Sequence, residues 1–364
     1  MFAQFLLLSL LSLITGAEEP GESPRAELYF VGDAMQHQAQ LDKAKELGKG
    51  NYDYSGCFSL ISPDILESDF AVCNLEVPLG GGNSYSGYPC FSAPDSYAEA
   101  LRNAGFNMML TANNHCLDRR DKAARRTLNV LDSLQVFHTG TFKDKESREE
   151  LIPFIKDING FKIGFLNYTY GTNGINPTDG FEVALIDKNQ IAKEIQKTRD
   201  SGAEIIVAAM HWGIEYVLTE NKVQRDLADF LIDEGVDVII GGHPHVVQPM
   251  KILRNEKEQK DVLVVFSLGN FISNMKTADT RGGALSRVLL KRDNNGKAFF
   301  STADYDTFFS SKPYGDENFK VIPSWEESKI PSTQMDHWKL FDRGSSKVFD
   351  KYNSGVNRKH PKSH

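Results

Sequence analysis

Short apolar segments recur along this chain, and stretches with helical spacing lie between several of them. They are rich in Val, Ile and Phe, which favour strands. These segments are Ala26–Val31, Phe70–Cys73, Asn107–Leu110, Ile163–Leu166, Ile205–Ala209, Val236–Ile240 and Val262–Phe266. The clearest helical pattern is Lys222–Glu234, which has on one face Val223, Leu227, Phe230 and Leu231. The alternation of strands and helices predicts an α/β fold.

Two later segments predict a hairpin, because Gly283–Lys291 and Ala298–Tyr305 flank the turn sequence Asn294-Asn295-Gly296. We expect a second sheet there. From about Ser345 to His364 the chain is polar and basic, which predicts a flexible tail. Large α/β folds reach this length with one core, so we expect a single elaborated domain over residues 26–310.

The N-terminus has the shape of a signal peptide over residues 1–17. Its apolar run is too short to span a bilayer, and the small residues Thr15-Gly16-Ala17 predict cleavage after Ala17. The alternative is an uncleaved membrane anchor, because no Lys or Arg precedes the apolar run. We therefore expect an exported protein, in the periplasm or at the cell surface.

The charge and the cysteine content bear on the partners of the protein and on its disulfide bonds. The formal net charge of −8 argues against a basic surface for nucleic acid, so we expect no nucleic-acid partner. With 40% hydrophobic residues, the chain can build a sizeable core. Export would permit disulfides, but the spacing selects no pairing and free buried thiols are an equal alternative. The four cysteines are Cys57, Cys73, Cys90 and Cys116.

Polar residues that can bind a metal stand where the predicted strands end. The carboxyl ends of strands in an open α/β sheet form the crevice that binds ligands, so these side chains should converge. Carboxylate, amide oxygen and neutral imidazole suit manganese, zinc or iron. We therefore predict one or two divalent metal ions, with the ligands Asp33, Glu76, Asn114, His211, His243 and His245.

Each of these features has an ordinary structural explanation when it is taken alone. Asp33 could cap a helix, Asn74 could belong to a surface loop, and Asn113 could close a turn. Gly241–His245 is the strongest single motif, because its two imidazoles can face the same way and its glycines permit close backbone approach. His37 lies four residues after Asp33 and could reach the same site. The joint occurrence at successive strand ends favours a metal site.

Six short motifs occur along the chain at the ends of the predicted strands. They are Val31-Gly32-Asp33, Asn74-Leu75-Glu76, Ala112-Asn113-Asn114-His115, His211-Trp212-Gly213 with Glu215, Gly242-His243-Pro244-His245 and Ser267-Leu268-Gly269-Asn270. In this order the motifs resemble the CapA family of capsule synthesis proteins. That family is associated with poly-γ-glutamate capsules and is a branch of the calcineurin-like metallophosphoesterase superfamily. The resemblance spans about two-thirds of the chain, and it implies a four-layer α/β/β/α sandwich with metals at the strand ends.

The resemblance also implies roles for single residues. Asn114 matches a metal ligand, and the neighbouring His115 stands near the substrate as a general acid or oxyanion partner. The remaining matches to ligand positions are Asp33, His211, His243 and His245.

Two departures from the wider superfamily leave one metal position open. Its opening Asp-x-His motif is missing, because Asp33 is followed by Ala34-Met35, and its second Gly-Asp motif is replaced by Asn74-Leu75-Glu76.

The function that we predict is a metal-dependent, phosphoesterase-like hydrolase in capsule biosynthesis. Water activated by metal would attack a phosphoryl or acyl centre while His115 protonates the leaving group. Glu215 and Asn74 would orient the ligands from outside the coordination sphere. The expected partners are an anionic surface polymer or a phosphoester, together with capsule machinery in the membrane. The alternatives are a non-catalytic module that binds such a polymer through the metal, and an amide hydrolase or transferase. A Cys116 nucleophile is a weaker alternative.

Overall fold

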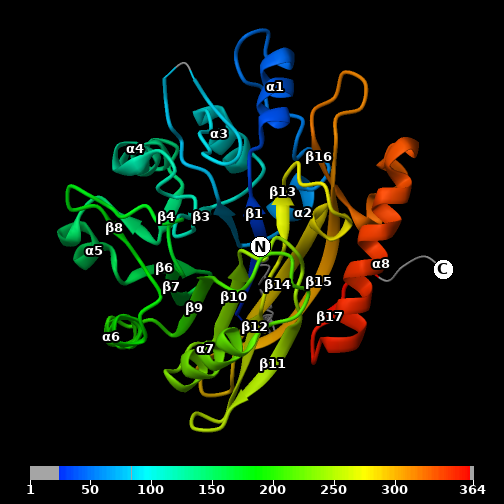
Figure 1. Ribbon diagram of the computed structural model, residues 1–364. Coiled ribbons are helices and arrows are strands. Elements are labelled where there is room, and N and C mark those ends of the chain that lie inside the picture. Colours follow the sequence, from blue (N-terminus) through cyan, green and yellow to red (C-terminus); the bar gives the residue numbers. More distant parts are fainter. Residues whose placement is uncertain (1–23, 83, 361–364) are drawn as a thin grey trace, which may run out of the picture.

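The computed structural model describes residues 24–82 and 84–360, and two mixed β-sheets dominate it (Figure 1). The first sheet has β1 near its middle, with parallel neighbours on one side and a long antiparallel hairpin on the other. Its strands, in spatial order, are β16 (Lys320–Pro323), β15 (Ala298–Ser311), β14 (Gly282–Arg292), β1 (Arg25–Ala34), β2 (Phe70–Leu75), β3 (Met108–Leu110) and β4 (Phe137–Thr139), with β13 (Asn270–Ile272) on β1 and β17 (Asn357–Arg358) on β15.

The second sheet consists of parallel strands with an antiparallel strand at each edge. Its order is β11 (Met250–Asn255), β12 (Lys260–Val265), β10 (Val238–Gly242), β9 (Ile205–His211), β7 (Phe161–Thr169) and β6 (Phe154–Ile158). A small separate ladder pairs β5 (Thr141–Phe142) with β8 (Glu182–Val183).

The two sheets pack face to face, and the helices cover their outer faces. Between the sheets, Leu28 of β1 and Val72 of β2 share a core with Val207 of β9 and Val265 of β12. Neighbouring residues point the other way, because side chains alternate along a strand. The helices are α1 (Gln38–Leu47), α2 (Ser62–Leu66), α3 (Asp95–Asn103), α4 (Arg120–Ser133), α5 (Lys145–Leu151), α6 (Lys188–Asp200), α7 (Lys222–Asp233) and α8 (Met335–Tyr352), with the 3₁₀ turns η1 (Ala278–Thr280), η2 (Ser324–Lys329) and η3 (Ser332–Gln334).

The outer cores complete a four-layer arrangement. On the first sheet, Tyr29 of β1 packs in one cluster with Leu101 of α3. On the second, Ile206 of β9 packs with Ile195 of α6 and Leu231 of α7. The layers are therefore helix, sheet, sheet and helix, and the predicted α/β/β/α sandwich is confirmed.

Helix α7 shows how local sequence sets an element. The Asn221 side chain accepts a 2.9 Å hydrogen bond from the backbone N–H of Gln224, which caps the first turn. Leu227 and Leu231 are buried as the helical spacing predicts, whereas Val223 in the first turn is exposed.

The hairpin β14–β15 forms as predicted, but the expectation that it starts a second sheet is wrong. Strand β14 pairs with β1 along residues 25–30, so the hairpin extends the first sheet. The second sheet is built instead from strands between residues 154 and 265.

The structure bears on the predicted C-terminal tail but not on the predicted signal peptide. The predicted signal peptide at residues 1–17 lies outside the described residues. Residues 345–352, expected in a flexible tail, form the last turns of α8, where Val348 and Phe349 pack against the core between the sheets.

Among the described residues, every helix is too short or too polar to cross a bilayer. The four cysteines are free thiols, and Cys90 is the exposed one.

Candidate metal centre

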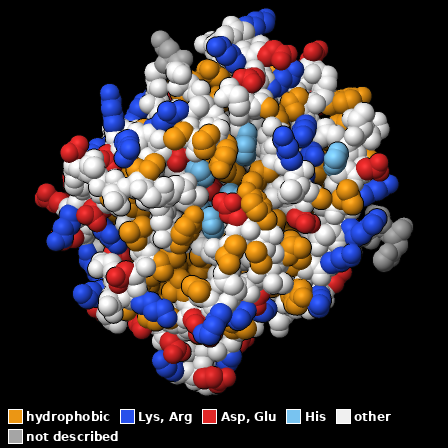
Figure 2. Space-filling model, in the orientation of Figure 1, with side chains coloured by type: hydrophobic (Ala, Val, Ile, Leu, Met, Phe, Trp, Pro, Cys, Tyr) orange, Lys and Arg blue, Asp and Glu red, His pale blue; other side chains and the backbone are white. Residues whose placement is uncertain are grey.

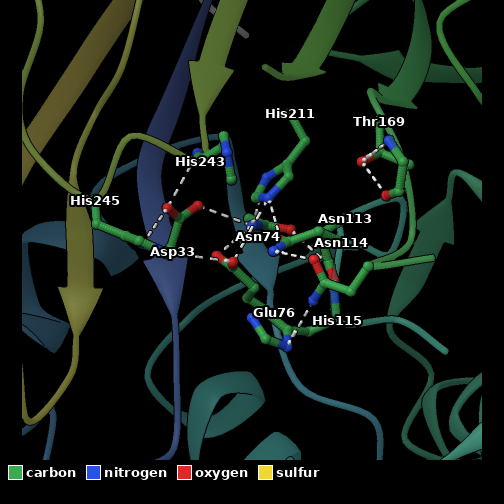
Figure 3. A network of polar contacts seen from close by, with 12 residues as sticks. Asp33, Asn74, Glu76, Asn113, Asn114, His115, Thr169, His211, His243 and His245 are labelled. Atoms are coloured by element: carbon green, nitrogen blue, oxygen red, sulfur yellow. Dashed lines mark hydrogen bonds and ion pairs between the residues drawn. The ribbon is translucent and has the colours of Figure 1, made fainter. Parts of the chain in front are cut away.

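The predicted ligands do converge, at the carboxyl ends of strands from both sheets (Figure 3). Asp33 lies near the end of β1, His211 ends β9, and the other ligands lie in the loops that follow β2, β3 and β10. All of them are buried, so few water molecules compete for their polar atoms. The buried set is Asp33, Glu76, Asn114, His211, His243 and His245.

Asn74 joins the two carboxylates of this centre. Its side-chain N–H₂ donates to Asp33 at 2.8 Å and to Glu76 at 3.3 Å. The orientation of this amide follows from Asn113, whose own N–H₂ donates to the Asn74 carbonyl oxygen at 3.1 Å. Asn74 therefore orients both acids from within the centre.

The segment Gly241–His245 approaches β1 closely because its glycines lack side chains. A Cβ on Gly242 would lie 2.8 Å from a carboxylate oxygen of Asp33. The backbone N–H of His243 donates to Asp33 at 3.2 Å. Both His243 (φ 94°) and His245 (φ 58°) adopt the left-handed conformation, which is uncommon outside glycine and is found preferentially at functional sites.

His211 and Asn114 face each other across the centre. The His211 Nε2 lies 2.8 Å from the side-chain oxygen of Asn114 and 3.5 Å from a carboxylate oxygen of Glu76. On the other side, His245 Nε2 lies 3.8 Å from the same Glu76 oxygen. The sequence alone did not indicate that Glu76 stands between the histidines.

The donor set fits a divalent ion. Two groups place one ligand atom of each residue within 4.8 Å of the others: Glu76 with His243 and His245, and Asp33 with Glu76 and His211. Glu76 belongs to both groups, as a carboxylate that bridges two ions would. Among the described residues, one carboxylate oxygen of Glu76 and Nδ1 of His243 are buried and find no hydrogen-bond partner. Such orphaned buried atoms are costly unless a ligand satisfies them.

Burial and charge determine the protonation of the acids and histidines. Burial raises the pKa of Asp33, but the hydrogen bond from His245 and the nearby imidazoles outweigh it and hold this pKa well below its usual range. Burial, with the charge of Asp33, raises the pKa of Glu76 well above its usual value. Burial lowers the pKa of His211 and of His243 to about 3. Both imidazoles are therefore neutral at pH 7, the form that binds metal.

His245 behaves differently. Burial lowers its pKa, but the charge of Glu76 and the hydrogen bond to Asp33 outweigh burial and raise it to about 9. Metal binding at this imidazole would therefore release a proton.

His115 forms a pair with Asp118 beside the centre. Its Nδ1 lies 2.8 Å from the Asp118 carboxylate, and both side chains are buried. The same Asp118 oxygen accepts a 2.8 Å hydrogen bond from the backbone N–H of Phe91, whose ring contacts His115 edge to face at 4.7 Å. In the described part of the chain no hydrogen bond is formed at His115 Nε2. The role of His115 as a general acid through this nitrogen stays a prediction.

Two further residues from the sequence prediction lie at the margin of the centre. His37 caps α1, and its Nδ1 accepts a 3.2 Å hydrogen bond from the backbone N–H of Asn274, so it is not a ligand of either group above. Glu215 is partly buried and lies beside Tyr216. Its charge partly offsets the effect of burial on the pKa of His211 and His243, and it adds to the raised pKa of His245. In the described structure it forms no hydrogen bond to these histidines. Its orienting role stays a prediction.

The sequence prediction missed Asn270 and Asp118. Asn270, on β13, places its side-chain oxygen 3.0 Å from His245 Nδ1, which fixes the ring and leaves Nε2 directed to Glu76. The sequence did contain a signal for Asn270, because this residue belongs to the motif Ser267–Asn270 that the chain shares with the family. Asp118 gave no comparable signal, because its spacing from His115 matters only once the loop is folded.

Comparison with known proteins places these motifs in one family. The family model described as bacterial capsule synthesis protein PGA_cap matches residues 27–275. The capsule biosynthesis protein CapA of Bacillus anthracis is 26% identical over 283 residues, which cover 75% of this chain and 66% of that protein. The PGA biosynthesis protein CapA of Bacillus subtilis strain 168 is 25% identical over 297 residues, 76% of this chain and 73% of that protein. The chain thus spans just under two-thirds of the length of the first relative.

Solved structures with a related arrangement are more distant. NAD nucleotidase from Haemophilus influenzae matches 89% of this chain and 60% of its own, with a TM-score of 0.48 and 11% identity. The calcineurin-like phosphoesterase YfkN from Bacillus subtilis matches 90% of this chain and 99% of its own, with a TM-score of 0.44 and 14% identity.

Proposed function

This chain belongs to the bacterial capsule synthesis protein family, and from that premise we propose that it is a metal-dependent, phosphoesterase-like hydrolase. We propose further that it acts in the biosynthesis of a cell-surface capsule polymer after export to the periplasm or cell surface. Its relatives are named for capsule and PGA biosynthesis. Capsule machinery in the membrane would be its partner.

The observation that carries this proposal is the shared position of Glu76. Glu76 belongs to both ligand groups. One of its buried oxygens and the buried Nδ1 of His243 have no hydrogen-bond partner among the described residues. One or two divalent ions, manganese, zinc or iron, would be held by these residues, and a bound ion supplies Lewis acidity and lowers the pKa of coordinated water. The full set of proposed ligands is Asp33, Glu76, Asn114, His211, His243 and His245.

The chain itself would supply proton transfer and orientation. Asp118 orients the His115 ring through its contact with Nδ1, so Nε2 can deliver a proton to the leaving group of a phosphoester. Asn74 and Asn270 hold the acids and His245 in position. Because burial keeps bulk water from these groups, the charges in the centre act on the substrate with little screening.

The test combines metal content with turnover. The mature chain is purified, its metal is measured by mass spectrometry, and hydrolysis of p-nitrophenyl phosphate and bis-p-nitrophenyl phosphate is followed with added manganese or zinc. His115→Ala should keep its metal and lose roughly 10²–10⁴-fold in kcat, the usual contribution of a general acid. His337→Ala, an exposed histidine on α8, is the matched control and should behave as the parent.

Each other outcome contradicts a defined part of the proposal. Bound metal without turnover on either substrate would favour a non-catalytic module that binds a surface polymer through the ion. A chain that binds no divalent metal would contradict both readings. Loss of metal in His115→Ala would contradict the assignment of His115 to proton transfer, because it would show that His115 is needed for metal binding.

A further inference from the structure

Three exposed tyrosines, Tyr88, Tyr170 and Tyr216, border the outer side of the metal centre, which we call its mouth. Figure 2 shows histidines in the middle of one face of the molecule with hydrophobic side chains beside them. Tyr170 is 49% exposed, Tyr216 is 52% exposed and Tyr88 is 72% exposed. They come from three different loops, those that follow β7, β9 and β2.

Each tyrosine contacts a different part of the centre. The Tyr170 ring lies 4.5 Å from the ring of His243 and 6.4 Å from the ring of His211, centroid to centroid. The Tyr216 ring lies 6.3 Å from that of His245. Tyr88 packs at 6.2 Å against Phe91, the residue that contacts His115. The rings therefore border the ligand groups and the proton-transfer pair alike.

Tyr216 adopts a backbone conformation that its side chain disfavours. Its φ is 67°, which is a genuine outlier for a bulky residue. The conformation is imposed by a 2.8 Å hydrogen bond from its backbone N–H to the carbonyl of Pro244, between the two ligand histidines. Half of the ring is nevertheless exposed, so the strain does not serve core packing. Strain that holds an exposed ring over a binding site indicates a function for the ring.

The polar groups at the mouth indicate what the rings would bind. Burial raises the pKa of the Tyr216 and Tyr170 phenols, and the charge of the Glu215 carboxylate is the next largest cause for both, so this carboxylate lies near both rings. A carboxylate is an acceptor only, so it suits the hydroxyl groups of a ligand and repels further carboxylates. A poly-γ-glutamate chain carries one carboxylate on every residue. A sugar ring instead offers apolar C–H faces to the tyrosines and hydroxyl donors to Glu215.

We infer that Tyr88, Tyr170 and Tyr216 form a subsite for a sugar ring, and that the substrate is a phosphoester of a sugar rather than of an acyclic polyanion. The reaction rests on the proposed function, whereas the binding of the ring does not. Aromatic rings provide large, rigid contact area at small entropic cost, which is why they select ring-shaped ligands.

The experiment compares a sugar phosphate with a ring-free phosphoester on the manganese-loaded protein. N-acetylglucosamine 1-phosphate and glycerol 3-phosphate are compared by kcat/KM where they turn over, and by Kd from calorimetry where they do not. The parent should prefer the sugar phosphate, and Tyr216→Gly should lower that preference roughly five- to tenfold, the usual contribution of one stacked ring. Tyr314→Ala, which removes an equally exposed tyrosine outside the centre, should keep the preference.

Tyr216→Gly also separates a binding role from a structural one. Glycine adopts this φ without strain, so the Tm of this variant should be unchanged or higher than that of the parent. A lower Tm together with an unchanged preference would mean that the ring serves folding, and would overturn the inference.

The remaining outcomes distinguish the inference from the proposed function. Sugar-phosphate binding that depends on Tyr216, without hydrolysis, would overturn the hydrolase and keep the subsite. Equal hydrolysis of both phosphoesters, insensitive to Tyr216→Gly, would keep the hydrolase and overturn the subsite. Tighter binding of uridine monophosphate or of tri-γ-glutamate than of N-acetylglucosamine 1-phosphate would overturn the assignment to a sugar.

Discussion

The substitution Gly32→Ala tests how closely β1 must approach β13 and the residue before it, Gly269, for the centre to form. A Cβ on Gly32 would lie 1.9 Å from the carbonyl oxygen of Gly269 and 2.9 Å from its carbonyl carbon. These are backbone atoms, so no side-chain rotation relieves the overlap. The next residue, Asp33, donates its backbone N–H to the same oxygen at 3.0 Å. The two strands must therefore separate, and Asp33 must move with β1.

The magnitude follows from the size of the overlap. Inserting one carbon into closely packed structure costs about 1–3 kcal/mol of unfolding free energy. For a chain of this length, roughly 2 °C of Tm is lost per kcal/mol, which gives a decrease of about 2–6 °C. A displaced Asp33 also weakens its contacts with His243 and Asn74, so manganese affinity should fall. Thermal unfolding by calorimetry and titration with manganese measure the two effects.

Gly56→Ala is the matched control. A Cβ there meets nothing within 4 Å and the backbone does not have a positive φ, so stability should stay the same or rise by up to about 1 kcal/mol. If Gly32→Ala, like Gly56→Ala, had the same Tm and the same manganese affinity as the parent, the metal centre would not depend on the close approach of β1 and β13.

Two further predictions concern the histidines. Asn270→Leu removes the oxygen that fixes His245, so manganese affinity measured by calorimetry should fall about 10–100-fold, while an unchanged affinity would contradict a positioning role. After removal of metal by a chelator, stability should fall as the pH drops from about 6.5 toward 3, because burial lowers the pKa of His211 and His243 and the unfolded chain then binds more protons. In this pH range each histidine changes the free energy of unfolding by about 1.4 kcal/mol per pH unit. The free energy of unfolding, measured by urea titration at several pH values, should therefore depend less steeply on pH in His243→Asn than in the parent.

The sequence by itself determined the elements and the candidate ligands. Apolar runs that end in polar residues predicted β1, β2, β9 and β10, and the parallel strands of one sheet share an edge for their carboxyl ends. That the edges of two different sheets meet at the centre was decided by the packing of the sheets. The Gly241–His245 motif predicted a close approach, and a Cβ on Gly242 would indeed lie 2.8 Å from Asp33.

Tertiary structure alone decided which distant groups meet. The hairpin β14–β15 joined the first sheet because its pairing with β1 depends on a partner more than 250 residues away in the chain. The same holds for Asp118 against His115, for Asn270 against His245, and for the strained Tyr216 over the mouth of the centre. Local patterns encode which face of a strand is buried and where it ends, but pairing and register follow from the packing of the whole chain.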